Sequence, residues 1–223
     1  MIEKKRLLKV YEKLTRAFGP QKWWPADTAF EVILGAILTQ STSWQNVERA
    51  IANLKNSKSL SFEKLLKMKT HRLAQLIKPA GYYNVKAQRL KNFISFMEKN
   101  YSGDLNRMKK QDTSILRRQL LSVCGIGPET ADSILLYAFQ KPVFVVDAYT
   151  RRIFSRHGYV KEGIDYEALQ RFFTRVLPAQ GRLFNEYHAL LVRLGKEFCK
   201  KTKMKCQACP LGKEAGRSFF RNN

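Results

Sequence analysis

Apolar residues recur at intervals of three and four positions along nearly the whole chain, the spacing that places them on one face of a helix. Stretches with this spacing begin at Leu7, Phe30, Val47, Leu65, Leu90, Leu116 and Leu169. The one β-like run, residues 142–146, has no second run of similar type to pair with. The pattern therefore predicts an all-α protein.

Glycine and proline separate the predicted helices at Gly19-Pro20, Pro79-Ala80-Gly81, Gly125-Ile126-Gly127, Gly158 and Pro178. The chain contains no low-complexity segment and no long repeat. Its 223 residues are enough for a full hydrophobic core, arranged as one large domain or as two small interleaved ones.

The turn Gly125-Ile126-Gly127 joins two helical patterns and is the most informative local feature. Paired glycines allow a tight turn and a close approach of another molecule, and Pro128 suits the first position of the next helix. The N–H groups of the turn and helix start would then form an anion site, with a DNA phosphate as its natural occupant. Asp147 follows one apolar run later, so we expect its carboxylate beside the ligand.

The chain has 41 Lys and Arg against 18 Asp and Glu, a formal charge of +23. This excess favours a polyanionic partner, although a lysine-rich surface that only aids solubility is the alternative. No apolar run reaches membrane-spanning length, so we expect no membrane partner. The charged N-terminal segment lacks the apolar core of a signal peptide. We therefore expect a cytoplasmic, nucleoid-associated protein without structural disulfides.

Five motifs occur in an order that resembles the endonuclease III-like, helix-hairpin-helix (HhH-GPD) superfamily of DNA base-excision glycosylases. They are LTQST (38–42), GYYNVKAQRL (81–90), VCGIGPETA (123–131), VVDAYTRR (145–152) and C-x6-C-x2-C at Cys199, Cys206 and Cys209. The resemblance runs from about residue 20 to residue 210. It implies a central helical domain over 28–137, a second over 1–27 plus 138–223, and a DNA-binding cleft between them. The implied partner is double-stranded DNA whose damaged base is flipped out, bound by a monomer.

By this resemblance, Asp147 matches the catalytic aspartate of the family. A fixed carboxylate stabilises the oxocarbenium-like transition state and can orient the attacking water; the alternative role is an N-cap. Glu129 stands where strand-cleaving relatives carry a nucleophilic lysine, and a carboxylate cannot form an imine. The resemblance thus implies a monofunctional glycosylase, although Glu129 can also serve the dipole of its helix.

The WWP stretch resembles the 3-methyladenine glycosylase type III branch of the superfamily, and this resemblance implies a pocket for the damaged base. It would contain Trp23, Trp24, Pro25, Trp44 and Glu129. Indole faces attract a cationic alkylated purine by ~0.5–2 kcal/mol; the alternative is that the tryptophans are core. Competing functions are a monofunctional glycosylase for damaged or mismatched pyrimidines, a non-catalytic helix-hairpin-helix DNA-binding module, and a redox sensor.

The resemblance also implies that two residues open the DNA. Gln40 would fill the gap left by the flipped nucleotide, and Tyr82 would wedge between base pairs; the alternatives are a helix-end polar residue and a half-buried loop residue. The further DNA contacts expected are Lys86, Gly125, Gly127, Thr130, Arg151 and Arg152.

Family members with a [4Fe–4S] cluster show a fourth cysteine five residues beyond the third. Here that position is Ala215, while Cys199, Cys206 and Cys209 are present. Three interpretations stay open: a cluster on three thiolates and an outside ligand, a zinc ion, or no metal. Cys124 is expected to pack as a small apolar residue in the hairpin.

Overall fold

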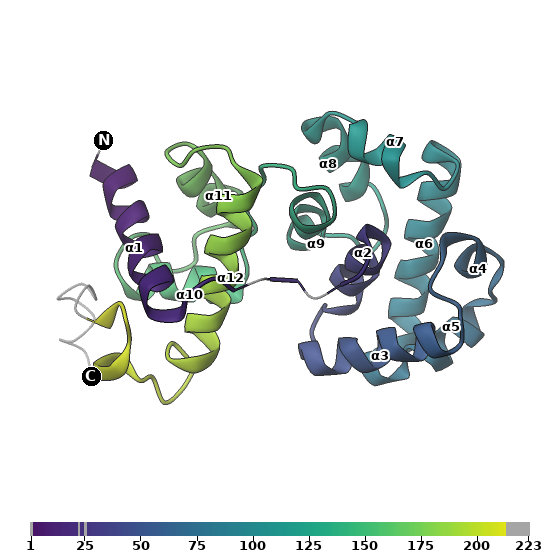
Figure 1. The fold of residues 1–223 in the computed structure, drawn as a ribbon, viewed down its shortest axis with the longest axis horizontal. Helices are drawn as coiled ribbons and strands as arrows, with labels where there is room; N and C mark the ends of the chain where they lie inside the picture. Colours follow the sequence, from purple (N-terminus) through teal and green to yellow (C-terminus); the bar gives the residue numbers. More distant parts are fainter. Residues whose placement is uncertain (1, 22, 25, 213–223) are drawn as a thin grey trace. The chain divides into compact units, whose positions relative to one another are not determined.

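The computed structural model describes residues 2–21, 23–24 and 26–212, and within this part of the chain all regular elements are helices (Figure 1). The predicted all-α fold is therefore confirmed. The chain divides into two compact units: unit 1 comprises Met1–Trp23 and Pro142–Asn223, and unit 2 comprises Trp24–Lys141.

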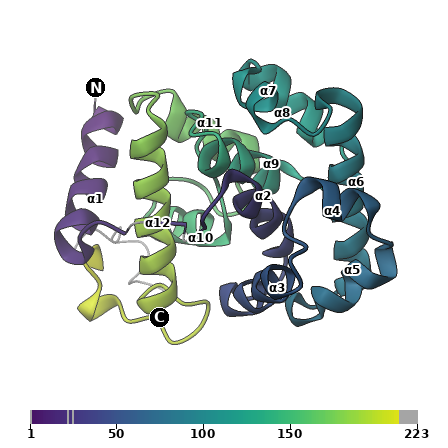
Figure 2. The same cartoon turned by 45° about the vertical axis from the view of Figure 1, so that its right-hand side comes forward.

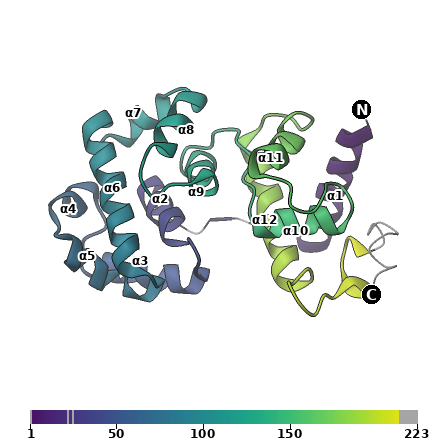
Figure 3. The same cartoon turned by 180° about the vertical axis from the view of Figure 1, so that it is seen from behind.

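Unit 2 is built around α6, which contacts α2, α4, α5 and α7 (Figures 2 and 3). Leu90, Phe93 and Met97 place one face of α6 in the core. α2 is apolar at every position except Glu31 and is buried almost throughout, as expected of a helix without a solvent face. The elements of unit 2 are α2 (Ala29–Leu38), α3 (Trp44–Asn56), α4 (Phe62–Lys67), α5 (Thr70–Leu76), η1 (Lys78–Ala80), α6 (Tyr83–Tyr101), α7 (Leu105–Lys110), α8 (Thr113–Leu121), α9 (Pro128–Ser133) and the π-helical turn η2 (Ile134–Ala138).

The glycine turn forms a hairpin between α8 and α9, as predicted. Gly127 is the N-cap of α9 and Pro128 is its first residue. Gly125 has φ +94°, and a Cβ at this position would collide with the Arg89 side chain, so only glycine fits without strain. Arg117 and Asp132 join the two helices by an ion pair, with Nε 2.7 Å from Oδ1 and Nη2 3.0 Å from Oδ2.

Unit 1 combines an N-terminal helix with helices from the C-terminal third of the chain. Its elements are α1 (Ile2–Phe18), α10 (Ala148–Arg156), α11 (Tyr166–Thr174), α12 (Gly181–Glu197) and η3 (Cys206–Ala208). α1 lies beside α12 (Figure 1), where the Tyr187 hydroxyl donates to the Leu7 carbonyl at 2.9 Å. Phe144, in the extended run before α10, stacks on Phe173 with ring centroids 3.9 Å apart. The core thus fixes the chain immediately before Asp147.

Candidate functional site

Asp147 lies at the start of α10 as its N-cap. Its backbone is extended, and its Oδ1 accepts a hydrogen bond of 2.7 Å from the backbone N–H of Thr150. The buried residues 143–146 hold the chain before it. The local sequence therefore anchors both sides of this residue, and its carboxylate has one defined orientation.

His188 is a partner of Asp147 that the sequence reasoning missed. Its Nε2 lies 3.5 Å from Asp147 Oδ2, and the two side chains are 7% and 11% exposed. The sequence signal was a histidine on the apolar face of α12, beside Tyr187 and Leu191, both fully buried. A polar ring on a buried face needs a polar partner.

The surroundings of Asp147 favour the ionised carboxylate. Burial by itself raises the pKa of Asp147, but His188 and the N–H group of Thr150 outweigh this effect, so that the pKa lies below its ordinary 3.8. A half-buried carboxylate that stays charged at neutral pH can stabilise a developing positive charge.

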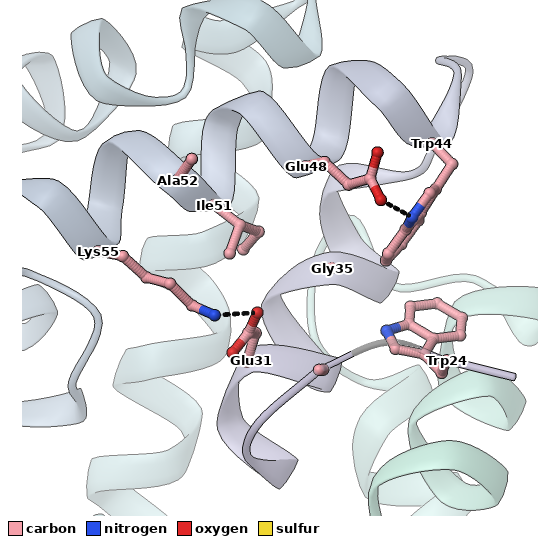
Figure 4. A pocket seen from close by; sticks show the side chains of 9 residues that line it. Trp24, Glu31, Gly35, Trp44, Glu48, Ile51, Ala52 and Lys55 are labelled. Atoms are coloured by element: carbon pink, nitrogen blue, oxygen red, sulfur yellow. Dashed lines mark hydrogen bonds and ion pairs between the residues drawn. The ribbon is translucent and has the colours of Figure 1, made fainter. Parts of the chain in front are cut away.

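Trp24 and Trp44 line a pocket of about 200 Å³ between α2 and α3 (Figure 4). Their rings meet edge to face with centroids 5.1 Å apart. Trp24 also packs against Tyr137, at 4.8 Å, and lies over Gly35, where a Cβ would sit 3.3 Å from the indole. A glycine in the middle of α2 therefore lets the indole approach the helix backbone.

Carboxylates outnumber cations in this pocket. Glu48 Oε1 accepts a hydrogen bond of 2.8 Å from Trp44 Nε1 (Figure 4). Lys55 Nζ lies 2.9 Å from Glu31 Oε1 and 2.7 Å from Asp27 Oδ2. Hydrogen bonds to Asp27 and Glu31 raise the pKa of Lys55, which keeps the ammonium charged. Two carboxylates, Glu31 and Glu48, and one ammonium, Lys55, line the pocket, so its formal charge is negative in a chain whose total charge is +23.

The other members of the expected base pocket are placed differently. Trp23 belongs to unit 1, where the Lys196 ammonium lies 5.5 Å from the ring centroid. Pro25 lies outside the described residues. Glu129 is exposed in the first turn of α9, in unit 2. Within unit 2 the structure therefore brings together Trp24 and Trp44.

Gln40 is held at both ends of its amide, by the hairpin at Nε2 and by α6 at Oε1. Its Nε2 donates to the Gly125 carbonyl at 3.0 Å and to the Thr130 hydroxyl at 2.9 Å, and its Oε1 accepts from Arg89. Gln40, Gly125 and Thr130, three of the expected DNA contacts, thus form one hydrogen-bonded cluster. Within this cluster, Thr130 is buried.

Tyr82 is 73% exposed and precedes α6 in the left-handed conformation, with φ 45°. A large exposed aromatic side chain in this backbone conformation is uncommon and suits a contact with another molecule. Gly127 has φ −92°, and a Cβ there would meet no atom within 4 Å. The start of α9 is therefore open to a ligand.

Lys86 requires a correction to the expected phosphate contacts. Its side chain is 1% exposed, and Nζ donates to the carbonyls of Leu38 and Ala80 at 2.9 and 2.7 Å. We therefore exclude Lys86 from the phosphate contacts.

Arg151 and Arg152 also bind main-chain carbonyls of unit 1. Arg151 donates to Ile164, and Arg152 donates to Cys199 at 2.7 Å. Both residues are half-buried.

The cysteine loop follows α12. Cys199 is buried, Cys206 and Cys209 are half-buried, and the three line one small pocket. Cys199 Sγ accepts from Arg156 at 3.4 Å, and no group of three His, Cys, Asp or Glu within the described residues is placed to hold a metal ion. Ala215 lies outside the described residues. The residues present do not fit a four-thiolate cluster, and no step proposed below depends on a metal.

Cys124 is exposed rather than packed in the hairpin. The turn between α8 and α9 directs its side chain outward, while its carbonyl accepts from Asn92 at 3.0 Å. The expectation of a packed apolar residue is therefore wrong.

In the described part of the chain, no helix is both long and apolar enough to cross a membrane.

Comparison with known proteins identifies the family of this chain. A family model described as "HhH-GPD superfamily base excision DNA repair protein" matches residues 34–179. The chain is 50% identical over 207 residues to "Putative DNA repair glycosylase MJ1434" of Methanocaldococcus jannaschii, covering 92% of this chain and 93% of that protein. It is 29% identical to endonuclease III of Thermotoga maritima over 81% of this chain and 79% of that protein.

Among solved structures, the H. pylori 3-methyladenine DNA glycosylase MagIII bound to 1,N6-ethenoadenine is similar, with a TM-score of 0.73 and 29% identity. The match covers 87% of this chain and 97% of MagIII. A non-covalent endonuclease III–DNA complex has a TM-score of 0.82 at 19% identity, a similarity of fold alone.

Proposed function

Because the chain belongs to the HhH-GPD superfamily of base excision DNA repair proteins and is a DNA glycosylase, we propose that it hydrolytically removes alkylated purines, such as 3-methyladenine, from duplex DNA. The observation that carries the choice of substrate is the pocket of Trp24 and Trp44 with its excess of carboxylates. A purine alkylated at N3 or N7 is a flat cation. An indole face attracts such a cation by ~0.5–2 kcal/mol, and Glu48 adds a carboxylate at the edge of the indole pair.

The size of the pocket agrees with an aromatic guest. An apolar cavity of ~150 Å³ holds benzene, and this pocket has about 200 Å³ and is open on one side. The similarity to MagIII bound to 1,N6-ethenoadenine adds weight, since that ligand is also a modified purine.

Asp147 would supply the chemistry. As the C1′–N9 bond breaks, its electron pair leaves with the purine and positive charge develops on the sugar. The ionised Asp147 carboxylate, oriented by the Thr150 N–H, stabilises that charge. Water then adds to C1′ and loses a proton, leaving an abasic site. Because the electron pair of the broken bond neutralises the positive charge that the alkylated base already carries, the base departs neutral and little acid catalysis is required.

We propose that the enzyme is monofunctional. A strand-cleaving glycosylase needs an amine that forms a Schiff base with C1′. The position that holds this amine in lyase relatives is Glu129 here, in the exposed first turn of α9. Its carboxylate interacts favourably with the dipole of α9 and cannot form a Schiff base.

DNA binding would use the open start of α9 and the positive charge of the chain. Gly127 leaves room for a phosphate to approach the N–H groups there. Tyr82 would enter the base stack next to the lesion. Gln40 would contribute its amide after exchanging some of its hydrogen bonds within the hairpin.

A panel of lesion-bearing duplexes tests this function. The purified protein is incubated with oligonucleotides carrying 3-methyladenine, 7-methylguanine, 1,N6-ethenoadenine, or uracil or thymine opposite guanine, and free bases are separated by chromatography. We expect release of alkylated purines, strand breaks only after alkali, and no covalent trapping by borohydride. Release of uracil or thymine alone would overturn the substrate assignment, and borohydride trapping would overturn the monofunctional assignment.

A further inference from the structure

Lys86 is a buried cation that connects two loops of unit 2. Its Nζ donates to the Leu38 carbonyl, at the last residue of α2, and to the Ala80 carbonyl, at the end of η1. Gln40 lies two residues beyond the first carbonyl, and Tyr82 lies two residues beyond the second. One ammonium therefore ties together the loops that carry these two side chains.

Two further polar side chains of α6 extend this connection along the same helix. Arg89 donates to Gln40 Oε1, and Asn92 donates to the carbonyl of Cys124 in the hairpin. Residues 86, 89 and 92 are spaced three apart, so they share one face of α6. We call these three residues the polar row of α6. It contacts, in order, the Tyr82 loop, the Gln40 loop and the glycine hairpin.

We propose that the polar row of α6 is a positioning device, in which Lys86 holds Tyr82 and Gln40 at a fixed spacing so that both act on one base pair during base flipping. The inference rests on the proposed function, because it assigns DNA-opening roles to Tyr82 and Gln40. Lys86 itself does not touch DNA.

Lys86 is buried at a cost that its two hydrogen bonds offset. Burial, with a smaller contribution from Arg89, lowers the pKa of Lys86 to about 8, so the ammonium is held at a cost in free energy. An apolar side chain of similar size would avoid that cost. It would also leave the Leu38 and Ala80 carbonyls without their donor, and the two loops would lose their connection.

Lys91 on the same helix provides a matched control. Its Nζ donates to the carbonyls of Leu65, Leu66 and Met68, each at 2.9 Å, and so binds the end of α4. Neither Tyr82 nor Gln40 lies in the segment that it binds. Lys86→Met and Lys91→Met thus each remove one ammonium from main-chain carbonyls, and only the first releases the DNA-opening loops.

The experiment measures flipping separately from binding. Duplexes carry 2-aminopurine beside an alkylated purine, and the fluorescence increase at saturating protein reports unstacking. We expect Lys86→Met to lose at least ten-fold in the rate of unstacking and in single-turnover excision, with a duplex Kd within about three-fold of the wild type. Lys91→Met should flip and excise like the wild type.

A double-mutant cycle tests whether Lys86 acts through Tyr82. In a Tyr82→Ala background, Lys86→Met should cause a much smaller further loss, because the wedge that it positions is already absent. Full additivity of the two losses would overturn the inference. Equal flipping by Lys86→Met and Lys91→Met would overturn it as well.

Should Lys86→Met not fold, Asn92→Ala tests the contact of the polar row with the hairpin, with Asn100→Ala as its control. Asn100 lies on the same helix and donates to the Phe96 carbonyl. Unstacking should slow with Asn92→Ala alone, and equal rates in the two variants would refute the polar row. If the wild type unstacks no duplex, the proposed function and this inference are both overturned. If the wild type and the variants of the polar row unstack the duplex equally fast, only the inference is overturned.

Discussion

Asp147→Asn separates the proposed role of Asp147 in catalysis from its role in folding. Asparagine is as good an N-cap as aspartate, so its amide oxygen can still accept the 2.7 Å hydrogen bond from Thr150. The substitution removes the negative charge and leaves the shape of the side chain almost unchanged. We expect excision to collapse while folding and duplex binding persist.

The magnitude follows from the burial of the carboxylate, which is 11% exposed. At an effective dielectric constant of ~20, opposite unit charges ~4 Å apart attract by ~4 kcal/mol. Losing this term in the transition state slows excision by ~10³-fold. The folded state loses the attraction between the charge and the start of α10, ~0.3–1 kcal/mol.

Asp165→Asn is the matched control, because Asp165 caps α11 with the same geometry and the same 2.7 Å bond, to the Ala168 N–H. Single-turnover excision of the best lesion is measured for both variants, with Kd from fluorescence anisotropy and unfolding in urea. Turnover by Asp147→Asn within about ten-fold of the wild type would refute the assignment of Asp147. An equal loss of excision in Asp165→Asn would show that the loss comes from weakened helix capping and not from a missing catalytic charge.

Four further predictions concern the hairpin and pH. Gly125→Ala should lower the free energy of unfolding in urea by ~1–3 kcal/mol, because φ +94° strains any other residue; Gly127→Ala should keep stability and weaken duplex binding, and unchanged anisotropy would contradict a phosphate at this position. Arg117→Met should cost ~3 kcal/mol in thermal unfolding, since the fully buried Asp132 loses its ion-pair partner; an unchanged Tm would contradict this value. Because the pKa of Asp147 is depressed below 3.8, its contribution to folding should be complete above about pH 5 and be lost as the pH falls through the lowered value. The contribution is measured as the difference in unfolding free energy between wild type and Asp147→Asn across pH 2–7, and a difference that fell between pH 7 and pH 5 would contradict the sign.

Features determined by neighbouring residues were predictable from the sequence. The hairpin glycines, Pro128 at the start of α9, and Asp147 as an N-cap all follow from local backbone preferences. The helical spacing likewise predicted the all-α fold. Each of these depends on contacts within a few residues.

Features that depend on distant segments were not predictable in the same way. Lys86 reads as a surface cation within an amphipathic helix, and only the carbonyls at the ends of α2 and η1 explain why it is buried. His188 meets Asp147 only because α12 packs on α10. Cys124 is exposed because the hairpin turns it away from the core. In each case a tertiary contact overrides what the local pattern indicates.

The division of unit 1 between the two flanks of unit 2 has a consequence for biosynthesis. Every residue of unit 2 has left the ribosome while α12 is still untranslated, so the glycine hairpin can form early. α1 must wait for α12, and Asp147 must wait for His188. α12 therefore completes both the packing of α1 and the surroundings of Asp147, after the segment that carries the glycine hairpin has been synthesised.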